Sequence, residues 1–538
     1  MCWASPTVGI KSLLILRISR CSKHYPSKAG ETIWMNPIDS IPYHLYFGEL
    51  ALHSSGSVTL TFSAIAIFLL VERVKRMNLI LEGKDASDWN YRGEGAVNLV
   101  LGYCGSSPAF VALEGPINYN FGVGKVLRVQ KVPRSESQHT TSKSILSRHE
   151  CLLWNDTQEL VTCSSKESLG QLFALHVMSP LLGSEHVDAG IRVLVSEEFL
   201  ESIEKNVISQ RPAWRVDAAK VNTLCDSALL ISDHSVFHHG SLKEDLCIAV
   251  EIKPKCGFLP SSRFIDEKNA IKKSITRYKM HQVLKLHQKE ISRLSEYDPL
   301  DLFSGSRERI IQATRALFAT PQNNFRIFFN RSLIYGGLGG GMDDAAVSDT
   351  RETTEAFEDL LKGVIQAGHG LRLASFLELV GEAIFQSGVL SQLLEVQKFD
   401  SFDIEGAIHS YYDIISQPCM ACKNLGNDEI LRRYSFLHSL SLEESLKIVR
   451  DYLIAATAKD CSLMISFRPT KDGDSTSEYS SVFLESTNQN FDYKAYFIDL
   501  DMKPLKRMVY YYELDQKIVN RYMQMKNTDC SPCNPMSI

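Results

Sequence analysis

An apolar stretch that ends in the charged run Glu251-Ile252-Lys253-Pro254-Lys255 constrains the fold of this chain most strongly. Residues 247–252 are almost continuously apolar, which is typical of a strand buried on both faces. Alternation along that strand predicts that Glu251, Lys253 and Lys255 point to one side, and Pro254 ends the hydrogen-bond ladder. Two cations and a carboxylate at a strand end indicate a site for an anion, with a solvated strand end as the alternative.

A second β-rich region surrounds a glycine turn. Residues 90–130 predict strands on both sides of Gly93-Glu94-Gly95, and residues 123–130 alternate apolar and polar side chains. Glycine lets backbone N–H groups approach phosphate oxygens, and Lys125 and Arg128 on the later strand would add cations. A plain hairpin turn is the alternative interpretation.

The remaining pattern predicts an α+β fold with a small β-rich N-terminal part and a larger mixed C-terminal part. Residues 227–231 predict a strand that runs into Ser232. Further strands are predicted at 461–467 and 493–500. Helices are predicted at 168–180, 195–207, 266–289, 354–398 and 442–458, with a last helix from about Pro504.

Carboxylates flank the two late strands. Asp460 precedes the strand at 461–467 and Asp499 ends the strand at 493–500. Phosphoryl transfer requires one carboxylate near the attacking hydroxyl and another on magnesium, although surface turns also contain aspartates. Lys503, Arg507 and Tyr511 follow at spacings of four, which predicts one shared helical face.

The predicted helix at 266–289 is basic. Such a run is usually a solvated face, but its position after Lys253 and Lys255 favours an anion-binding surface. The cations concerned are Lys272, Lys273, Arg277, Lys279 and Lys285.

Two histidines and a Cys-x-x-Cys pair predict a metal site. Cys419 and Cys422 have a spacing found in zinc knuckles, and His409 and His438 lie on either side. Zinc takes such N and S ligands in closed structural sites. Redox use of the cysteines is the alternative.

Bulk properties narrow the class of protein. The net charge of −5 and the lack of a DNA- or RNA-binding motif argue against a nucleic-acid partner. Thirteen cysteines without a disulfide-scaffold pattern indicate a reducing compartment, hence an intracellular protein of the cytoplasm or nucleus. The apolar run at 58–71 is short for a membrane span, and it reads as an anchor, a targeting extension, or sequence absent from the working protein. A monomer is expected.

Several stretches together resemble the inositol-pentakisphosphate 2-kinase family in its plant form. They cover roughly residues 77–530, and Glu-x-Lys-Pro-Lys at 251–255 is the most specific of them. The others are Tyr91-Arg-Gly-Glu-Gly95, Tyr297-Asp-Pro-Leu-Asp-Leu-Phe303, Pro321-Gln-Asn-Asn-Phe325, Ala456-Thr-Ala-Lys-Asp-Cys461 and Asp499-Leu-Asp-Met-Lys-Pro-Leu-Lys506.

The resemblance implies a two-lobed kinase-like fold, ATP, magnesium, a structural zinc, and inositol hexakisphosphate (phytate) as product. Asp460 and Lys253 would be catalytic, and Asp499 would bind magnesium. The nucleotide would contact Gly95, Ala96, Val97, Asn98, Arg128, Ser232, Asp233, His234, Glu251 and Arg326. The inositol phosphate would contact Arg215, Lys255, Lys285, Asn323, Lys503, Arg507 and Tyr511. Zinc would be held by His409, Cys419, Cys422 and His438.

A kinase of another inositol phosphate and a non-catalytic polyanion-binding module are the alternatives. The two aspartates favour an enzyme, because carboxylates would repel the ligand of a simple anion binder. Expected regions are an N-terminal lobe at 77–234, a C-terminal lobe at 235–530 with the zinc staple at 409–438, and a tail at 531–538.

Three features depart from the family pattern. Residues 1–76 have no counterpart in it, and residues 112–121 look like an insertion before the strand that carries Arg128. Pro133 stands where relatives carry a phosphate-binding Arg, a role that Arg134 could take.

Overall fold

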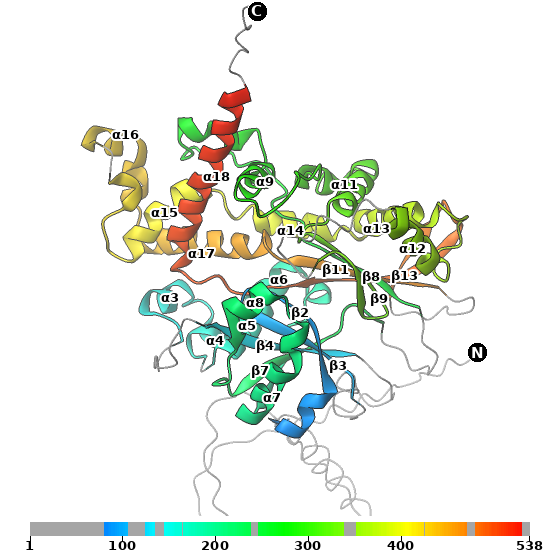
Figure 1. Ribbon diagram of the computed structural model, residues 1–538. Coiled ribbons are helices and arrows are strands. Elements are labelled where there is room, and N and C mark those ends of the chain that lie inside the picture. Colours follow the sequence, from blue (N-terminus) through cyan, green and yellow to red (C-terminus); the bar gives the residue numbers. More distant parts are fainter. Residues whose placement is uncertain are drawn as a thin grey trace, which may run out of the picture. The chain divides into compact units, whose positions relative to one another are not determined.

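The computed structural model describes residues 80–105, 124–134, 145–163, 165–237, 246–337, 351–423, 426–470 and 479–529 (Figure 1). All of them belong to one unit of the chain, Arg76–Ile538. The apolar run at 58–71, the insertion at 112–121 and the tail at 531–538 lie outside the described residues. The fold is mixed α+β with two sheets, as the sequence predicts.

The first sheet has seven strands in the order β1-β5-β7-β4-β3-β2, and β6 pairs with β4 away from this path. The predicted strands around the glycine turn and before Ser232 are confirmed. The strands are β1 (Ile80–Leu81), β2 (Trp89–Glu94), β3 (Asn98–Tyr103), β4 (Lys125–Pro133), β5 (Ile191–Val195), β6 (Ala219–Val221) and β7 (Ser227–Ser232).

The second sheet has six strands in the order β10-β9-β8-β11-β13-β12, and all of its neighbours are antiparallel. Every residue of β8 is buried, which explains why its sequence is apolar except at Glu251. The strands are β8 (Ile248–Ile252), β9 (Phe325–Phe329), β10 (Ser332–Tyr335), β11 (Ser462–Pro469), β12 (Ser480–Leu484) and β13 (Gln489–Ile498).

The helices that bear on the site come from both ends of the described chain. Those near the first sheet are α3 (Arg148–Leu153), α4 (Gln158–Val161), α5 (Lys166–Phe173), α6 (Ser179–Leu182), α7 (Glu197–Val207) and α8 (Ala213–Ala218). The later ones are α9 (Arg277–His287), α10 (Pro299–Leu302), α11 (Arg307–Ala319), α12 (Arg351–Leu361), α13 (Arg372–Ser387), α14 (Val389–Gln397), α15 (Asp403–Ile414), α16 (Asn427–His438), α17 (Leu442–Ala458) and α18 (Arg507–Asp529).

The predicted basic helix at 266–289 is in fact two elements. A 3₁₀-helix, η5 (Glu267–Lys273), ends before α9 begins. Thr276 is the residue that separates them, because its side chain accepts a hydrogen bond from the backbone N–H of Lys279 and caps α9. The charges of η5 and α9 therefore do not share one face.

Each sheet has its own hydrophobic core. Phe199, Leu200 and Ile203 of α7 pack with the apolar side chains of the first sheet. The larger core joins the second sheet to α11, α13, α14, α15 and α17, helices that Figure 1 shows gathered beside that sheet. Trp154 and Phe173 pack into this larger core, although α3 and α5 lie between strands of the first sheet in the sequence.

Among the described residues, we find no single helix that is both long and apolar enough to cross a bilayer. Helices α13 and α14 meet the length and composition test only as a pair, with a bend of 66° between them.

Candidate active site

Three neighbouring strands of the second sheet end at one place. Ser462 of β11 lies opposite Ile498 of β13, so Asp460 and Asp499 emerge at the same edge. Strand β8 also ends there, because Ile252 pairs with Leu463, and Lys253 follows it directly. The aspartates that flank the two late strands therefore lie at one edge of the sheet, close to Lys253.

Lysines surround the carboxylate of Asp460. Lys503 Nζ donates to Asp460 Oδ2 at 2.9 Å, and Lys255 Nζ lies 3.7 Å from Oδ1. Burial alone would raise the pKa of Asp460, but Lys255, Lys503 and Lys253 outweigh it and hold that pKa well below its usual range. The side chain is still 58% exposed. Asp460 is therefore an ionised acceptor that a ligand hydroxyl can reach.

A pair of carboxylates, Asp499 and Asp501, lies where residues of the two sheets contact one another. Arg128 of β4 donates to Asp501 at 2.9 Å and lies 3.7 Å from Asp499. Asn98 of β3 donates to Asp501 at 3.4 Å, and Lys253 Nζ lies 3.5 Å from Asp499. The first sheet thus supplies a cation and an amide to carboxylates that follow the second sheet.

Asp501 was not predicted from the sequence, although the Asp499-x-Asp501 spacing could have indicated it. Asp499 has φ of +61°, a strained conformation for a residue other than glycine, and its side chain is 41% exposed. Burial opposes ionisation of Asp499, yet Lys253 and Arg128 outweigh it and lower its pKa. Exposed, ionised carboxylate oxygens are the ligands that magnesium prefers, so these residues fit that ion.

The lysine run does not follow simple alternation. Strand β8 ends at Ile252, and Lys255 has φ of +64°. The prediction that Glu251, Lys253 and Lys255 share one face of a strand is therefore wrong. A turn after the strand, not alternation along it, directs Lys255 toward Asp460. Burial and the nearby cations lower the pKa of Lys255 to about 8.

Helix α9 adds cations to the Asp460 side of the site. Lys285 interacts electrostatically with both Lys255 and Asp460. His281, one turn earlier, was not predicted, because one histidine inside a basic helix carries no distinct signal. Burial, Arg277, Lys285 and Lys255 lower its pKa to about 3, so His281 is neutral in the free protein.

The last helix begins later than predicted. Helix α18 starts at Arg507, so Lys503 lies before it and does not share its face, which corrects the prediction. Tyr511 still lies close enough to interact electrostatically with Lys503 and Arg507. The Arg507 guanidinium lies over the ring of Tyr510 at 5.0 Å.

The residues expected to hold adenine and ribose lie at the ends of β7 and β8. Ser232 and Asp233 are buried, and the ring of His234 stacks on Tyr496 at 3.9 Å. Glu251 accepts hydrogen bonds from Ser462 Oγ and from Arg326 Nη1, both at 2.9 Å.

The remaining predicted residues occupy turns or short elements. Gly95, Ala96 and Val97 connect β2 to β3, and Val97 is 50% exposed. Asn323 lies in the turn before β9. Arg215 of α8 stacks over Trp214 at 4.1 Å. Lys125 donates to Ser232 Oγ at 3.2 Å, and Arg134 donates to Val216 O at 2.5 Å.

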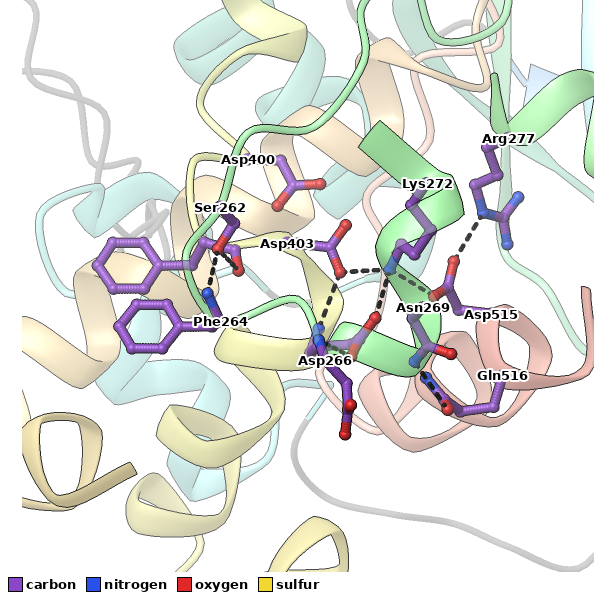
Figure 2. A network of polar contacts seen from close by, with 12 residues as sticks. Ser262, Phe264, Asp266, Asn269, Lys272, Arg277, Asp400, Asp403, Asp515 and Gln516 are labelled. Atoms are coloured by element: carbon purple, nitrogen blue, oxygen red, sulfur yellow. Dashed lines mark hydrogen bonds and ion pairs between the residues drawn. The ribbon is translucent and has the colours of Figure 1, made fainter. Parts of the chain in front are cut away.

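Lys272 is not part of an anion surface, which corrects the prediction for the basic run. Its ammonium donates to Asp403 at 2.6 Å, Glu405 at 3.0 Å and Asp515 at 2.6 Å (Figure 2). We call these four buried residues the Lys272 cage. Three carboxylates so close together could hold a metal ion, but the Lys272 ammonium already lies among them.

The two predicted histidines and two cysteines lie together. His409 Nδ1 is 3.1 Å from His438 Nε2 and 3.4 Å from Cys419 Sγ, and Cys422 Sγ is 3.4 Å from His438 Nε2. Tetrahedral zinc bonded to two nitrogens and two sulfurs spaces its ligand atoms by roughly 3.3–3.8 Å. His438 also contacts Asp413 through Nδ1 at 3.2 Å, an outer contact typical of ligand histidines. The residues therefore fit zinc.

The fold and the site define a phosphotransferase-type enzyme, since strand-end carboxylates held ionised by lysines face a glycine turn across two sheets. The inositol-pentakisphosphate 2-kinase family model matches residues 91–517. The chain therefore belongs to the inositol-pentakisphosphate 2-kinase family, and membership implies ATP and a divalent metal ion.

Individual relatives carry the same name. An inositol-pentakisphosphate 2-kinase of Oryza sativa subsp. japonica is 54% identical over 459 residues, which cover 85% of this chain and 98% of the relative. The enzyme of Arabidopsis thaliana is 54% identical over 458 residues, covering 84% and 97%. That of Danio rerio is 28% identical over 506 residues, covering 82% and 95%.

Proposed function

We propose that this protein transfers the γ-phosphoryl group of ATP to the 2-hydroxyl of inositol 1,3,4,5,6-pentakisphosphate. The hydroxyl oxygen bonds to the γ-phosphorus, the bond from that phosphorus to the β-γ bridging oxygen breaks, and ADP and inositol hexakisphosphate (phytate) leave. The observation that carries the proposal is the exposed, ionised Asp460 within a ring of lysines.

Asp460 accepts the hydrogen bond of the attacking hydroxyl. Its lowered pKa makes it a weak base in the free protein, so the proton moves to it only as the new O–P bond forms. Lys253 lies between Asp499 and the Asp460 side and stabilises charge on the transferred group.

The nucleotide contacts the first sheet and β8. The turn from Gly95 to Asn98 and Arg128 hold its phosphates, and Asp499 holds magnesium, which neutralises phosphate charge when bound. The adenosine part is held by Ser232, Asp233, His234 and Glu251, and Arg326 adds a further cation for the phosphates.

The inositol phosphate binds beside Asp460, where Lys255 and Lys503 lie. Each phosphate ester carries close to two negative charges near neutral pH, so a pentakisphosphate needs many donors. The residues proposed for this role are Arg215, Lys255, Lys285, Asn323, Lys503, Arg507 and Tyr511.

These roles go with a two-lobed kinase arrangement, with an N-terminal lobe at 77–234 and a C-terminal lobe at 235–530. The separate cores of the two sheets support two lobes, although Trp154 and Phe173, within the proposed N-terminal lobe, pack into the core of the second sheet. We also propose that the protein works in the cytoplasm or nucleus, where thiols stay reduced, as a monomer without a nucleic-acid partner.

Product analysis tests the function. The purified chain is incubated with ATP, magnesium and inositol pentakisphosphate bearing a free 2-hydroxyl, and products are separated by anion exchange. Asp460→Asn should lower kcat by about 100- to 10,000-fold with little change in either KM. Asp359→Asn on the exposed face of α12 is the matched control. Folded wild-type protein without product, or wild-type turnover by Asp460→Asn, would refute the proposal.

We propose in addition that His409, Cys419, Cys422 and His438 hold a structural zinc ion. Burial alone would raise the pKa of Cys419, but hydrogen bonds with His409 and His438 lower it to about 6, which suits a thiolate ligand. Metal analysis should find one zinc per chain, and a strong chelator should lower Tm. Equal melting with and without the chelator would exclude the zinc.

A further inference from the structure

Glu94 is the last residue of β2, at the start of the glycine turn, and its side chain is buried rather than exposed. Both the Glu94 and Arg211 side chains are fully buried. Arg211 Nε donates to Glu94 Oε1 at 2.9 Å, and Arg211 Nη2 donates to Glu94 Oε2 at 3.1 Å. Lys131 Nζ also donates to Glu94 Oε2. Two cations thus donate hydrogen bonds to one buried carboxylate, and Arg211 does so in the bidentate geometry that a guanidinium group favours.

Lys131 ties the Glu94 carboxylate to the turn itself. Its ammonium donates to Gly95 O at 2.7 Å, and its backbone N–H donates to Val97 O at 2.7 Å. The turn is closed further by the Gly95 N–H, which donates to Asn98 O at 2.9 Å. The position of the turn at residues 95–98 therefore depends on Lys131, and Lys131 depends on Glu94.

Arg211 ties the same carboxylate to helix α8. Its Nη2 donates to Arg215 O at 3.4 Å and to Ala219 O at 2.9 Å. Arg211 is followed by Pro212, the N-cap residue of α8. Glu204 anchors the other edge of the guanidinium at 3.3 Å and accepts from Val221 N–H at 3.0 Å. We call Glu94, Lys131, Arg211 and Glu204 the Glu94 network.

We propose that Glu94 is a positioning residue that couples the two substrates of this enzyme. Its buried carboxylate connects the turn at residues 95–98, which receives ATP phosphates, to Arg215, which receives an inositol phosphate group. This inference rests on the proposed function. A ligand that orders one side of the network reduces the ordering cost on the other, so each ligand binds more tightly in the presence of its partner.

Calorimetry of the full chain tests the coupling without turnover. The Kd of a non-hydrolysable ATP analogue with magnesium is measured alone and with saturating inositol pentakisphosphate. The wild-type protein should bind the analogue at least about fivefold more tightly in the presence of the inositol phosphate. In Glu94→Gln this factor should fall close to one, while each ligand alone still binds.

Two further variants separate coupling from stability. Arg211→Lys keeps the charge but cannot donate to Glu94 and to both carbonyl groups, so it should also lose coupling. Glu204→Gln weakens the same network without touching the turn or Arg215, and it should lower Tm but keep the wild-type factor. Conservative Glu94→Asp should restore part of the coupling and replaces Glu94→Gln if that variant does not fold.

The outcomes are distinct from those of the product assay. Wild-type coupling in folded Glu94→Gln, or equal losses in Glu204→Gln and Glu94→Gln, would overturn the inference and leave the proposed function intact. Wild-type protein that binds no inositol pentakisphosphate would overturn both. Product formation without any wild-type coupling would overturn the inference alone.

Discussion

The Glu94 network and the Lys272 cage both keep charged side chains buried, but with opposite ratios of cations to carboxylates at their centres. At the centre of the Glu94 network, two cations share the Glu94 carboxylate beneath the first sheet's glycine turn, and Glu204 pairs with the outer edge of one of them, Arg211. In the Lys272 cage, one ammonium lies among three carboxylates from α15 and α18. Buried charge is costly in both, and each is stable because all of its charges have hydrogen-bonded partners.

The difference shows what each network contributes to its surroundings. The Lys272 cage has three carboxylates and one ammonium. A second cation, Arg277, lies at the edge of the cage, 3.4 Å from Asp515. Burial together with the neighbouring Asp515 and Asp400 raises the pKa of Asp403 to about 7, against the effect of Lys272. The cage therefore retains a proton near neutral pH, whereas in the Glu94 network hydrogen bonds from Arg211 and Lys131 outweigh burial and keep Glu94 ionised.

Removal of the ammonium should have the largest effect. Lys272→Met leaves three buried carboxylates without their shared partner, so the free energy of unfolding should fall by about 3–5 kcal/mol. Urea unfolding measures it, and Lys273→Met is the control because Lys273 is exposed and adjacent. A loss of unfolding free energy below about 1 kcal/mol would mean that another cation pairs with the three carboxylates in place of Lys272.

Loss of the guanidinium fork should have a smaller effect. Arg211→Lys preserves one buried charge but leaves the carbonyl groups of Arg215 and Ala219 without their donor. We expect a loss of about 1–3 kcal/mol in unfolding free energy. Arg192→Lys, in the partly exposed pair with Asp226, is the control and should change little. Equal losses would show that the fork geometry contributes nothing.

The retained proton gives a pH test of the Lys272 cage. A carboxyl pKa raised in the folded state means that the folded protein binds more protons than the unfolded chain. Asp403 therefore contributes stability below about pH 4 that is lost as pH rises through about 7. Asp403→Asn, which keeps an acceptor and tolerates the φ of +59°, should remove this slope, at most about 1.4 kcal/mol per pH unit.

The comparison for this test is the difference between the two proteins at each pH. Urea unfolding at pH 5 and at pH 8 gives the free energy of unfolding of both proteins. The value for Asp403→Asn minus that for the wild type should be lower at pH 5 than at pH 8. An unchanged difference across that range would show that the proton is not held by Asp403.

An exposed ion pair should give the smallest effect and calibrates the others. Lys447 and Asp451 pair across one turn of α17, and the Lys447 side chain is 67% exposed. Lys447→Ala should cost about 0.3–0.5 kcal/mol, and added salt should reduce even that. The buried networks should respond to salt much less, so a similar salt dependence in Lys272→Met would contradict the burial argument.

The parts of the fold that sequence could predict are those with a repeating physical pattern. Strand β8 was evident because burial on both faces favours apolar residues, which occupy every position of the strand except Glu251. Strand β1 has two residues that pair in parallel with β5, and so short a segment carries no period of its own. Its structure depends on tertiary contacts that no local pattern records.

The site divides in the same way. Asp460, Asp499 and Lys253 could be predicted because strand ends bring residues together. Lys272 and Lys285 looked alike in the sequence, but Lys272 is buried in the cage whereas Lys285 interacts electrostatically with Asp460. Charge along a chain does not reveal burial, and the carboxylates that surround Lys272 come from positions more than 130 residues away.

The pairing of every active-site carboxylate with a cation has a consequence for product release. Lys503 and Lys255 contact Asp460, while Lys253 and Arg128 contact Asp499. In the proposed reaction, an arriving phosphate would take over cations that already have anionic partners, and a departing one would return them. Asp460 and Asp499 would then take the place of phosphate between turnovers. The hexakisphosphate product would leave without exposing unpaired lysines, so tight recognition and rapid release would be compatible in one site.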